Sequence, residues 1–305
     1  MVNPVNMKKA QSLRVRLTDL GAKALLPAFR REAQQPESDH PRLAPGVTLQ
    51  DVTFHSVALN RPMNYRVLLP EVLAPGQKLP VAYLLHGLGD DYRSWSNWTD
   101  ISRYAVLSPL GGLILVMPEG ASSWYMNAAG KPEDKYEDYL TQDLIDDVEA
   151  RFPAEKGRAN RAILGISMGG FAAVKLALSR PELFVFVGAF SPAIDAPRRR
   201  FPLRRAEQWW RFRTIFGPWE SKTRDSSDPF LLAQSANPAA TPHLFLSAGD
   251  QEDLIEPNLR FTAGLRERHF SYEFHRTPGG HNWGEWNAQI PNWFHSLCKY
   301  LNQTG

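Results

Sequence analysis

A serine placed between glycines, Ser167, is the residue in this sequence with the clearest potential for chemistry. An apolar run over residues 163–166 leads into the motif G-I-S-M-G at 165–169, and an alanine-rich stretch with helical character follows over 171–178. This is the G-x-S-x-G pattern, a sharp strand-to-helix turn that lifts a serine hydroxyl above the end of a parallel sheet. Small neighbours are needed there because helix and strand cross closely. The pattern predicts that Ser167 is a nucleophile, the alternative being an ordinary glycine turn.

A carboxylate and a histidine follow the serine, each in a loop that comes after a strand-like run. The run 243–249 is followed by the acidic loop D-Q-E-D at 250–253, and the run 271–276 by P-G-G-H-N-W, which contains His281. A neutral serine hydroxyl attacks carbonyls poorly, so an imidazole must take its proton and later return one to the leaving group. The order serine, acid, histidine is that of α/β hydrolases. We therefore predict His281 as the base and an acid near position 252 as its orienting group.

Backbone donors are needed for the negative charge that develops on the substrate carbonyl oxygen. This type of fold takes them from the residue after the nucleophile, here Met168, and from a loop after an earlier strand. The apolar run 80–85 ends in H-G-L-G-D at 86–90, which places Leu88 as the second donor. We expect the ring of His86 to brace this glycine loop and not to transfer protons.

The elements that must position these residues alternate between strands and helices. Alternating apolar residues over 52–59 and 63–69, separated by a turn, predict an antiparallel hairpin. Continuous apolar runs predict buried strands, and helical spacing predicts helices at 97–107 and 136–152 and at the C-terminus. Such alternation indicates an α/β fold with a mostly parallel, doubly wound sheet.

Two segments depart from this alternation. Residues 1–46 are expected to form an N-terminal extension with a short amphipathic helix and a proline-bearing link, ahead of a main domain at 47–305. The pattern fails again at about 191–241, which we interpret as an inserted cap. Its interleaved arginines and aromatic residues could bind nucleic acid, but a net charge of only +3 and the lack of a recognised binding fold favour a packed cap. Arginines beside a substrate cleft would favour an anionic substrate or product, which stays open.

Composition limits the class of protein. The 305 residues, 43% hydrophobic and 22% charged, are typical of a globular protein. The apolar runs are too short to cross a bilayer, so no membrane partner is expected. The single cysteine, Cys298, excludes an internal disulfide and a multi-cysteine metal site, and no metal or other cofactor is expected. Charged residues over 14–23 interrupt any secretory signal. The location is therefore cytoplasmic if the chain is complete, or extracellular if a signal peptide has been removed. A homo-oligomer is neither indicated nor excluded.

Four motifs together resemble a known family. H-G-L-G-D at 86–90, S-W at 94–95, G-I-S-M-G-G at 165–170 and P-G-G-H-N-W at 278–283 are similar to motifs of the esterase D family, α/β hydrolases related to carbohydrate esterase family 1. That family includes S-formylglutathione hydrolases, feruloyl and acetylxylan esterases and the antigen 85 mycolyltransferases. The resemblance runs from about residue 47 to the C-terminus. It implies an α/β-hydrolase fold and a cofactor-free serine esterase that works through an acyl-enzyme.

The triad acid is the point where this chain departs from the commonest family pattern. Many relatives have Gly-x-x-Asp, whereas counting three residues on from Gly249 reaches Glu252, with Asp253 next. The gapless count favours Glu252, and a one-residue insertion would favour Asp253. Either carboxylate could orient a histidine.

The substrate is less well defined by the sequence. Trp95, Trp124 and Tyr125 follow strands in loops where an aromatic acyl group could stack, although packing beneath the cap explains them equally well. We expect a carboxylesterase acting on short-acyl or feruloyl-type esters of small molecules or carbohydrates. The alternatives are an S-formylglutathione hydrolase-like thioesterase, an acyltransferase, and a non-catalytic binding protein that kept the fold.

Overall fold

A computed structural model of the chain describes residues 39–107, 110–202 and 205–301. The amphipathic helix expected near the N-terminus lies outside the described residues. Within them, eight strands form one sheet in the order β1-β2-β4-β3-β5-β6-β7-β8. The strands are β1 Val47–Ser56, β2 Arg61–Pro70, β3 Val81–Leu85, β4 Ile114–Pro118, β5 Arg161–Ile166, β6 Phe186–Phe190, β7 His243–Gly249 and β8 Tyr272–Thr277.

The sheet is parallel except at its N-terminal edge. β1 and β2 form the expected antiparallel hairpin, and β2 also pairs antiparallel with β4. The remaining neighbours, from β4 through β8, pair in parallel. The predicted α/β fold with its doubly wound sheet is therefore confirmed. Its parallel strands end along one edge, where loops that are far apart in sequence can meet.

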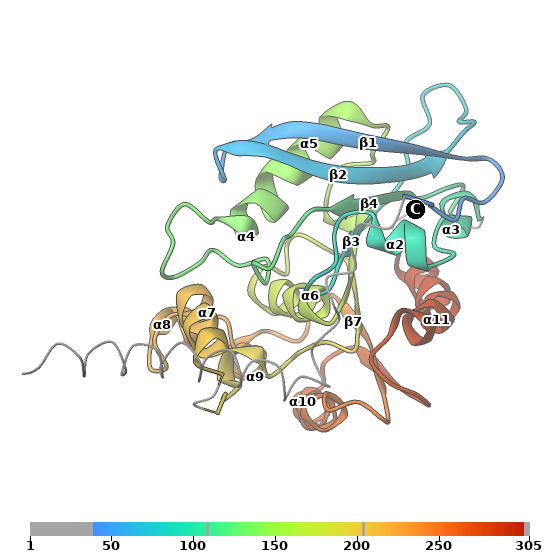
Figure 1. Cartoon of the computed structure of the whole chain (residues 1–305). Coiled ribbons are helices and arrows are strands. Elements are labelled where there is room, and N and C mark those ends of the chain that lie inside the picture. The colour runs from blue at the N-terminus through green and yellow to red at the C-terminus, as the bar shows by residue number, and fades with distance from the viewer. Residues whose placement is uncertain (1–38, 108–109, 203–204, 302–305) are drawn as a thin grey trace, which may run out of the picture. The chain divides into compact units, whose positions relative to one another are not determined.

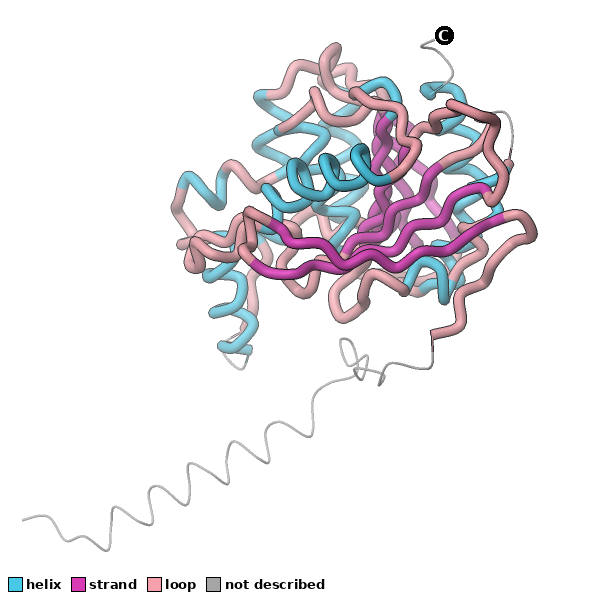
Figure 2. The backbone as a smooth tube through the Cα atoms, turned by 90° about the horizontal axis from the view of Figure 1, so that it is seen from above, coloured by secondary structure: helices cyan, strands magenta, loops and turns pink. Residues whose placement is uncertain are grey.

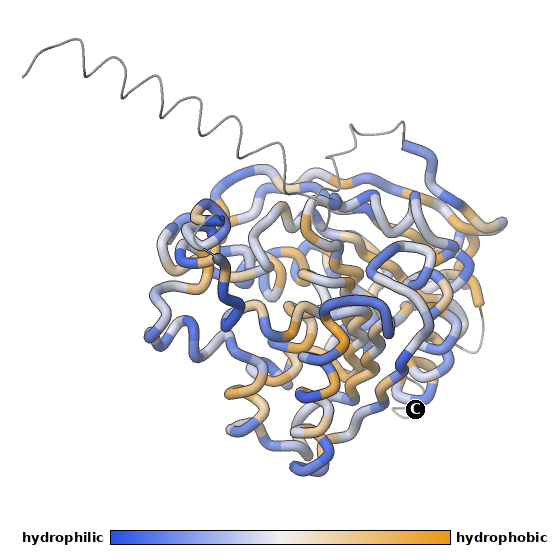
Figure 3. The backbone as a smooth tube through the Cα atoms, turned by 60° about the horizontal axis from the view of Figure 1, so that its bottom comes forward, coloured by the Kyte–Doolittle hydropathy of each residue, from blue (hydrophilic) through white to orange (hydrophobic). Residues whose placement is uncertain are grey.

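Helices cover both faces of the sheet (Figures 1 and 2). They are α2 Ser94–Trp98, α3 Arg103–Val106, α4 Tyr136–Asp138, η1 Tyr139–Asp143, α5 Leu144–Arg151, η2 Arg158–Asn160, α6 Met168–Ser179, η3 Ala196–Arg198, α7 Ala206–Phe216, α8 Lys222–Asp225, α9 Pro229–Ser235, α10 Ile255–Glu267 and α11 Trp283–Leu301. Alternate residues of β3 enter two separate cores. Tyr83 packs in the core with α5, α6 and α10, whereas Leu84 packs in the core with α2, α3 and α11. The hydrophobic segments accordingly gather in the interior (Figure 3).

Some element boundaries differ from the predictions. The helix expected over 97–107 is two short helices, because Thr99 adopts extended backbone angles that end α2. The helix expected over 136–152 is present as α4 and α5, joined by the π-helical turn η1. Helical spacing of apolar residues identifies the buried face but does not register such local breaks in the hydrogen-bond ladder.

The segment between β6 and β7 contains η3, α7, α8 and α9. Arg224 is only 4% exposed. Its guanidinium holds this segment together by donating hydrogen bonds to the backbone carbonyls of Pro197, Phe212 and Gly217. Burial lowers the pKa of this guanidinium, and neighbouring arginines add to the effect. The carbonyl oxygens disperse the charge, so one side chain of α8 connects η3 with the C-terminal part of α7 and the residue that follows it.

Across residues 39–107, 110–202 and 205–301, we find no helix with the length and apolar character needed to cross a bilayer.

Candidate active site

Ser167 occupies the turn between β5 and α6 with backbone angles of φ 51° and ψ −109°. A left-handed φ is strained for a residue with a side chain. The Ser167 N–H donates to the Phe190 carbonyl at 2.9 Å, which ties the turn to the end of β6. A Cβ atom on Gly165 would lie 2.2 Å from the Gly169 carbonyl carbon, and one on Gly169 would lie 2.5 Å from the Leu85 oxygen. Glycine at both positions therefore lets the helix approach the strands closely enough to form the turn.

A continuous chain of hydrogen bonds joins Ser167, His281 and Glu252. His281 Nε2 lies 2.9 Å from Ser167 Oγ, and His281 Nδ1 lies 2.6 Å from Glu252 Oε2. The other carboxylate oxygen of Glu252 accepts the Gly249 N–H at 2.9 Å. The Glu252 side chain is 2% exposed, whereas that of His281 is 35% exposed. The carboxylate is thus held away from water, and the imidazole and the serine hydroxyl remain accessible.

The two carboxylates that the sequence left as alternatives have different surroundings. Glu252 is buried and faces His281, whereas the adjacent Asp253 is exposed. Leu254, the next residue, is buried. Asp250 contacts the histidine loop in another way, since its Oδ1 accepts the Gly279 N–H at 3.2 Å. Of the two alternatives, Glu252 is the one that the structure brings to the imidazole.

The two residues predicted as oxyanion donors, Met168 and Leu88, belong to segments that adjoin Ser167. Met168 is the first residue of α6, where a backbone N–H has no acceptor within its own helix. Leu88 lies in the loop after β3 and is 44% exposed. This loop is close to the serine, because a Cβ atom on Gly87 would lie 3.6 Å from Ser167 Cβ. Met168 and the loop that carries Leu88 are therefore close to Ser167, and the role of their N–H groups as oxyanion donors stays a prediction.

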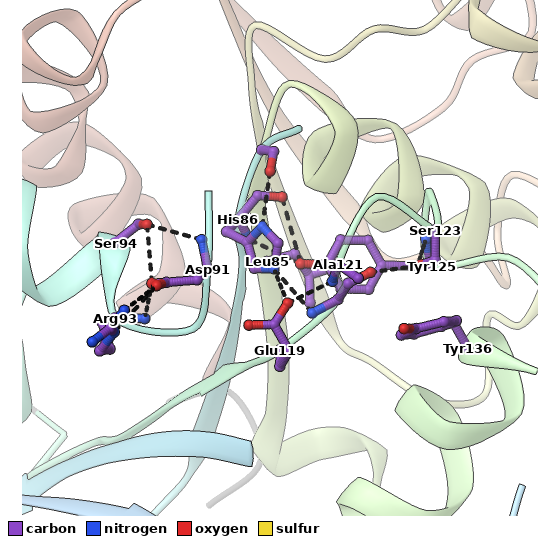
Figure 4. A network of polar contacts seen from close by, with 12 residues as sticks. Leu85, His86, Asp91, Arg93, Ser94, Glu119, Ala121, Ser123, Tyr125 and Tyr136 are labelled. Atoms are coloured by element: carbon purple, nitrogen blue, oxygen red, sulfur yellow. Dashed lines mark hydrogen bonds and ion pairs between the residues drawn. The ribbon is translucent and has the colours of Figure 1, made fainter. Parts of the chain in front are cut away.

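A polar network centred on His86 supports the loop that follows β3 (Figure 4). The fully buried ring of His86 contacts the Gly87 carbonyl through Nδ1 at 2.8 Å and accepts the Gly120 N–H at Nε2 at 2.9 Å. Because Nε2 accepts, the ring proton is on Nδ1 and is donated to Gly87. The Tyr125 hydroxyl accepts the His86 N–H at 3.0 Å, and burial raises the pKa of Tyr125 well above its usual value. His86 thereby joins the loop after β3 to the loop after β4.

The aromatic residues expected at the substrate site are buried. Trp95 is 0% exposed and donates its indole N–H to the Leu85 carbonyl at 3.2 Å. Trp124 is 5% exposed and packs edge-on against Phe171 and Phe216, and Tyr125 is 1% exposed. Packing against neighbouring side chains thus accounts for all three, and their role as substrate contacts stays a prediction.

The cap arginines are partly engaged with carboxylates. Arg198 pairs with Asp225 and Asp228, and Arg199 pairs with Asp195 at 2.7 Å. These pairs reduce the positive charge that was considered as a binding site for anionic substrates. Across the described ranges, no group of three His, Cys, Asp or Glu side chains is placed to hold a metal ion.

Sequence reasoning did not identify the residues that contact the imidazole apart from its two hydrogen-bond partners. Trp286, on α11, packs in the core, and its ring also meets that of His281 at 90° with centroids 4.9 Å apart. Its indole N–H donates to Ser191 Oγ at 3.0 Å. The position of Trp286 five residues after His281 was the available signal, although spacing alone does not show that a core residue also touches a site.

Comparison with known proteins gives a consistent picture. The Esterase family model matches residues 56–297. An acetyl esterase from Caldicellulosiruptor saccharolyticus is 25% identical over 268 residues, which cover 83% of this chain and 99% of that protein. The diacylglycerol acyltransferase/mycolyltransferase Ag85A of Mycobacterium tuberculosis is 25% identical over 293 residues, covering 85% of this chain and 83% of that protein.

A solved structure agrees with these sequence matches. FphF, a fluorophosphonate-binding serine hydrolase of Staphylococcus aureus, superposes with a TM-score of 0.70 at 26% identity, covering 84% of this chain and 99% of that one. The sheet, the strand-turn-helix at Ser167 and the extent of the family match lead to the same assignment. This chain belongs to the Esterase family and has the α/β-hydrolase fold.

Proposed function

We propose that the protein is a serine carboxylesterase that hydrolyses short-acyl esters through an acyl-enzyme. The observation that carries this proposal is the hydrogen-bond chain from Ser167 Oγ through His281 to Glu252, with lengths of 2.9 and 2.6 Å. A serine, an imidazole and a buried carboxylate in this order are the groups that nucleophilic acyl transfer requires.

Each residue has a defined role in the proposed reaction. Ser167 Oγ attacks the ester carbonyl carbon while His281 Nε2 takes the hydroxyl proton, and Glu252 stabilises the resulting imidazolium. The oxyanion accepts hydrogen bonds from the Met168 and Leu88 N–H groups. Collapse of the tetrahedral intermediate breaks the bond to the alcohol oxygen, which receives the proton from His281. Water, activated by the same imidazole, then releases the acid and restores Ser167.

A short acyl group is the better supported substrate. The aromatic side chains that suggested feruloyl stacking, Trp95, Trp124 and Tyr125, are buried. The similarity to an acetyl esterase over 83% of the chain favours a small acyl group as well. Acyl transfer to an alcohol is the second candidate, because the Ag85A relative is named as an acyltransferase and the same acyl-enzyme would serve both reactions.

The test is a panel of p-nitrophenyl esters of increasing acyl length, with methyl ferulate and S-formylglutathione, assayed for wild type and Ser167→Ala. We expect the highest kcat/KM on the acetyl ester and a loss of about 10⁴-fold or more in Ser167→Ala. Ser179→Ala, at the other end of α6, is the matched control and should retain activity. Addition of an alcohol acceptor separates transfer from hydrolysis. Absence of Ser167-dependent turnover on every ester would refute the proposal.

A further inference from the structure

The His281 ring has an aromatic contact in addition to its two hydrogen bonds. The bonds to Ser167 and Glu252 use Nε2 and Nδ1, the two nitrogens that flank Cε1. Hydrogen bonds tolerate a spread of angles, so the ring plane can still tilt by small changes of the side-chain torsions. Trp286 meets the imidazole at 90° with centroids 4.9 Å apart, which opposes that tilt. The indole therefore adds a packing constraint on the plane of the ring to the two hydrogen bonds.

The loop that carries His281 is tied at its backbone, where the Gly279 carbonyl accepts the Gln251 N–H at 2.9 Å, but that bond does not act on the imidazole ring. The loop begins with Gly279, in a left-handed conformation with φ 113°, and Gly280, around which a Cβ atom would meet nothing within 4 Å. The His281 side chain is 35% exposed. The two glycines carry no side chain that could pack against the ring, so the orientation of the ring depends on contacts from other elements.

Trp286 is itself held in a defined orientation. It is 3% exposed, and its indole N–H donates to Ser191 Oγ at 3.0 Å. Ser191 has a left-handed φ of 46° and donates its N–H to the Ser247 carbonyl on β7 at 2.7 Å. The preceding residue, Phe190, accepts the Ser167 N–H. Ser191 is thus tied to the strand that leads to the acid and adjoins the residue that anchors the nucleophile.

We propose that Trp286 is a positioning residue that fixes the plane of the His281 imidazole, and that Ser191 fixes Trp286. The inference rests on the proposed function of His281. It explains why Trp286 on α11 donates a buried hydrogen bond to Ser191, the residue after β6, since packing of the core alone does not require this bond. Trp293, on the same helix, shows the contrast: it is 0% exposed, and its indole nitrogen has no hydrogen-bond partner among the described residues.

The test compares Trp286→Phe, Trp286→Leu, Ser191→Ala and the double variant Trp286→Phe/Ser191→Ala with wild type on p-nitrophenyl acetate. A misplaced base costs up to about 10²-fold in rate, so we expect Trp286→Leu to lower kcat by about that factor with KM unchanged. Trp286→Phe and Ser191→Ala should each lower kcat by about tenfold. Because both remove the same hydrogen bond, the double variant should be no slower than either single variant.

Two controls separate positioning from loss of stability. Trp293→Phe truncates an equally buried indole away from His281, so it should lower the melting temperature and leave kcat unchanged. Ser191→Gly removes the hydroxyl while relieving the left-handed φ, so it should match Ser191→Ala in kcat if the hydrogen bond, and not backbone strain, is responsible.

A spectroscopic measurement keeps this inference distinct from the proposed function. The Nδ1 proton shared by His281 and Glu252 should give a far-downfield proton NMR line that Glu252→Gln abolishes. We expect Trp286→Leu to shift or broaden this line and Trp293→Phe to leave it in place. Wild-type protein that shows the line but no Ser167-dependent turnover would refute the proposed function alone. Folded Trp286→Leu with an unchanged line and wild-type kcat would overturn the positioning role.

Discussion

Replacing Glu252 by glutamine should disable the proposed reaction while leaving the fold intact. Glu252 accepts a hydrogen bond from Gly249 through one oxygen and bonds His281 Nδ1 through the other. Glutamine can keep its oxygen on the Gly249 N–H, but its amide group then faces Nδ1. An amide donor there requires the ring proton to move to Nε2, which can no longer accept the Ser167 proton.

The size of the effect follows from the charge that is removed. Two unit charges about 4 Å apart near a protein surface attract by about 4 kcal/mol. At 1.36 kcal/mol for each factor of ten, this is about 10³-fold in rate. The wrong tautomer adds to the loss, so we expect kcat to fall by 10³- to about 10⁴-fold. Since the imidazolium forms only as the reaction proceeds, the loss should appear in kcat and not in KM.

Asp253→Asn is the matched control, because it makes the same neutralising change one residue further along. Asp253 is exposed and does not face the imidazole, so its variant should keep kcat within about twofold of wild type. The assay is steady-state hydrolysis of p-nitrophenyl acetate, with circular dichroism melts to establish that both variants fold. A loss of several orders of magnitude in Asp253→Asn, with Glu252→Gln near wild type, would refute the reasoning.

The remaining predictions concern stability. Gly165→Ala places a Cβ atom 2.2 Å from Gly169 and should lower the free energy of unfolding by about 3 kcal/mol. Gly264 lies in α10 with open space around it, so Gly264→Ala should raise the free energy of unfolding by about 0.5 kcal/mol. Urea titrations of both variants measure the two effects. Arg224→Met leaves several cap carbonyls without their donor and should cost about 3 kcal/mol, which a thermal melt would reveal; an unchanged melt would contradict the bracing role of this residue. Burial lowers the pKa of His243 from its usual 6.5, although a neighbouring glutamate acts to raise it. Below about pH 6.5 the unfolded chain therefore binds more protons than the native state, and stability falls as the pH is lowered toward the native pKa. Urea unfolding of wild type and His243→Gln should be measured above and below that pH. The free energy of unfolding should fall less on acidification in the variant than in wild type, and equal falls would exclude His243 as the source.

Much of the fold was accessible from the sequence because it depends on local patterns. The apolar run before Ser167 and the alanine-rich stretch after it predict a strand and a helix, and the glycines between them permit the strained turn. The glycine loop that contains His281 likewise follows a strand. Since parallel strands end at one edge of the sheet, the order of these loops was enough to predict that serine and histidine would meet.

Side-chain direction was not accessible in the same way. Trp95, Trp124 and Tyr125 follow strands at the correct edge, yet all three turn inward and are buried. An aromatic residue in a loop gains free energy by burying its large apolar surface, and whether it does so depends on which element packs over it. In this protein, Phe171 and Phe216, from two different helices, cover Trp124.

By itself, the sequence determined the fold class, the strand-turn-helix at Ser167 and the loop that presents His281, because each is encoded by neighbouring residues. Only the tertiary structure shows which of the two carboxylates contacts His281, namely Glu252. Adjacent side chains in a turn point in different directions, and the choice depends on how the chain passes from β7 into α10. The contact between Trp286 and His281 was decided in the same way, since the packing of α11 against the end of β6 brings the indole to the imidazole.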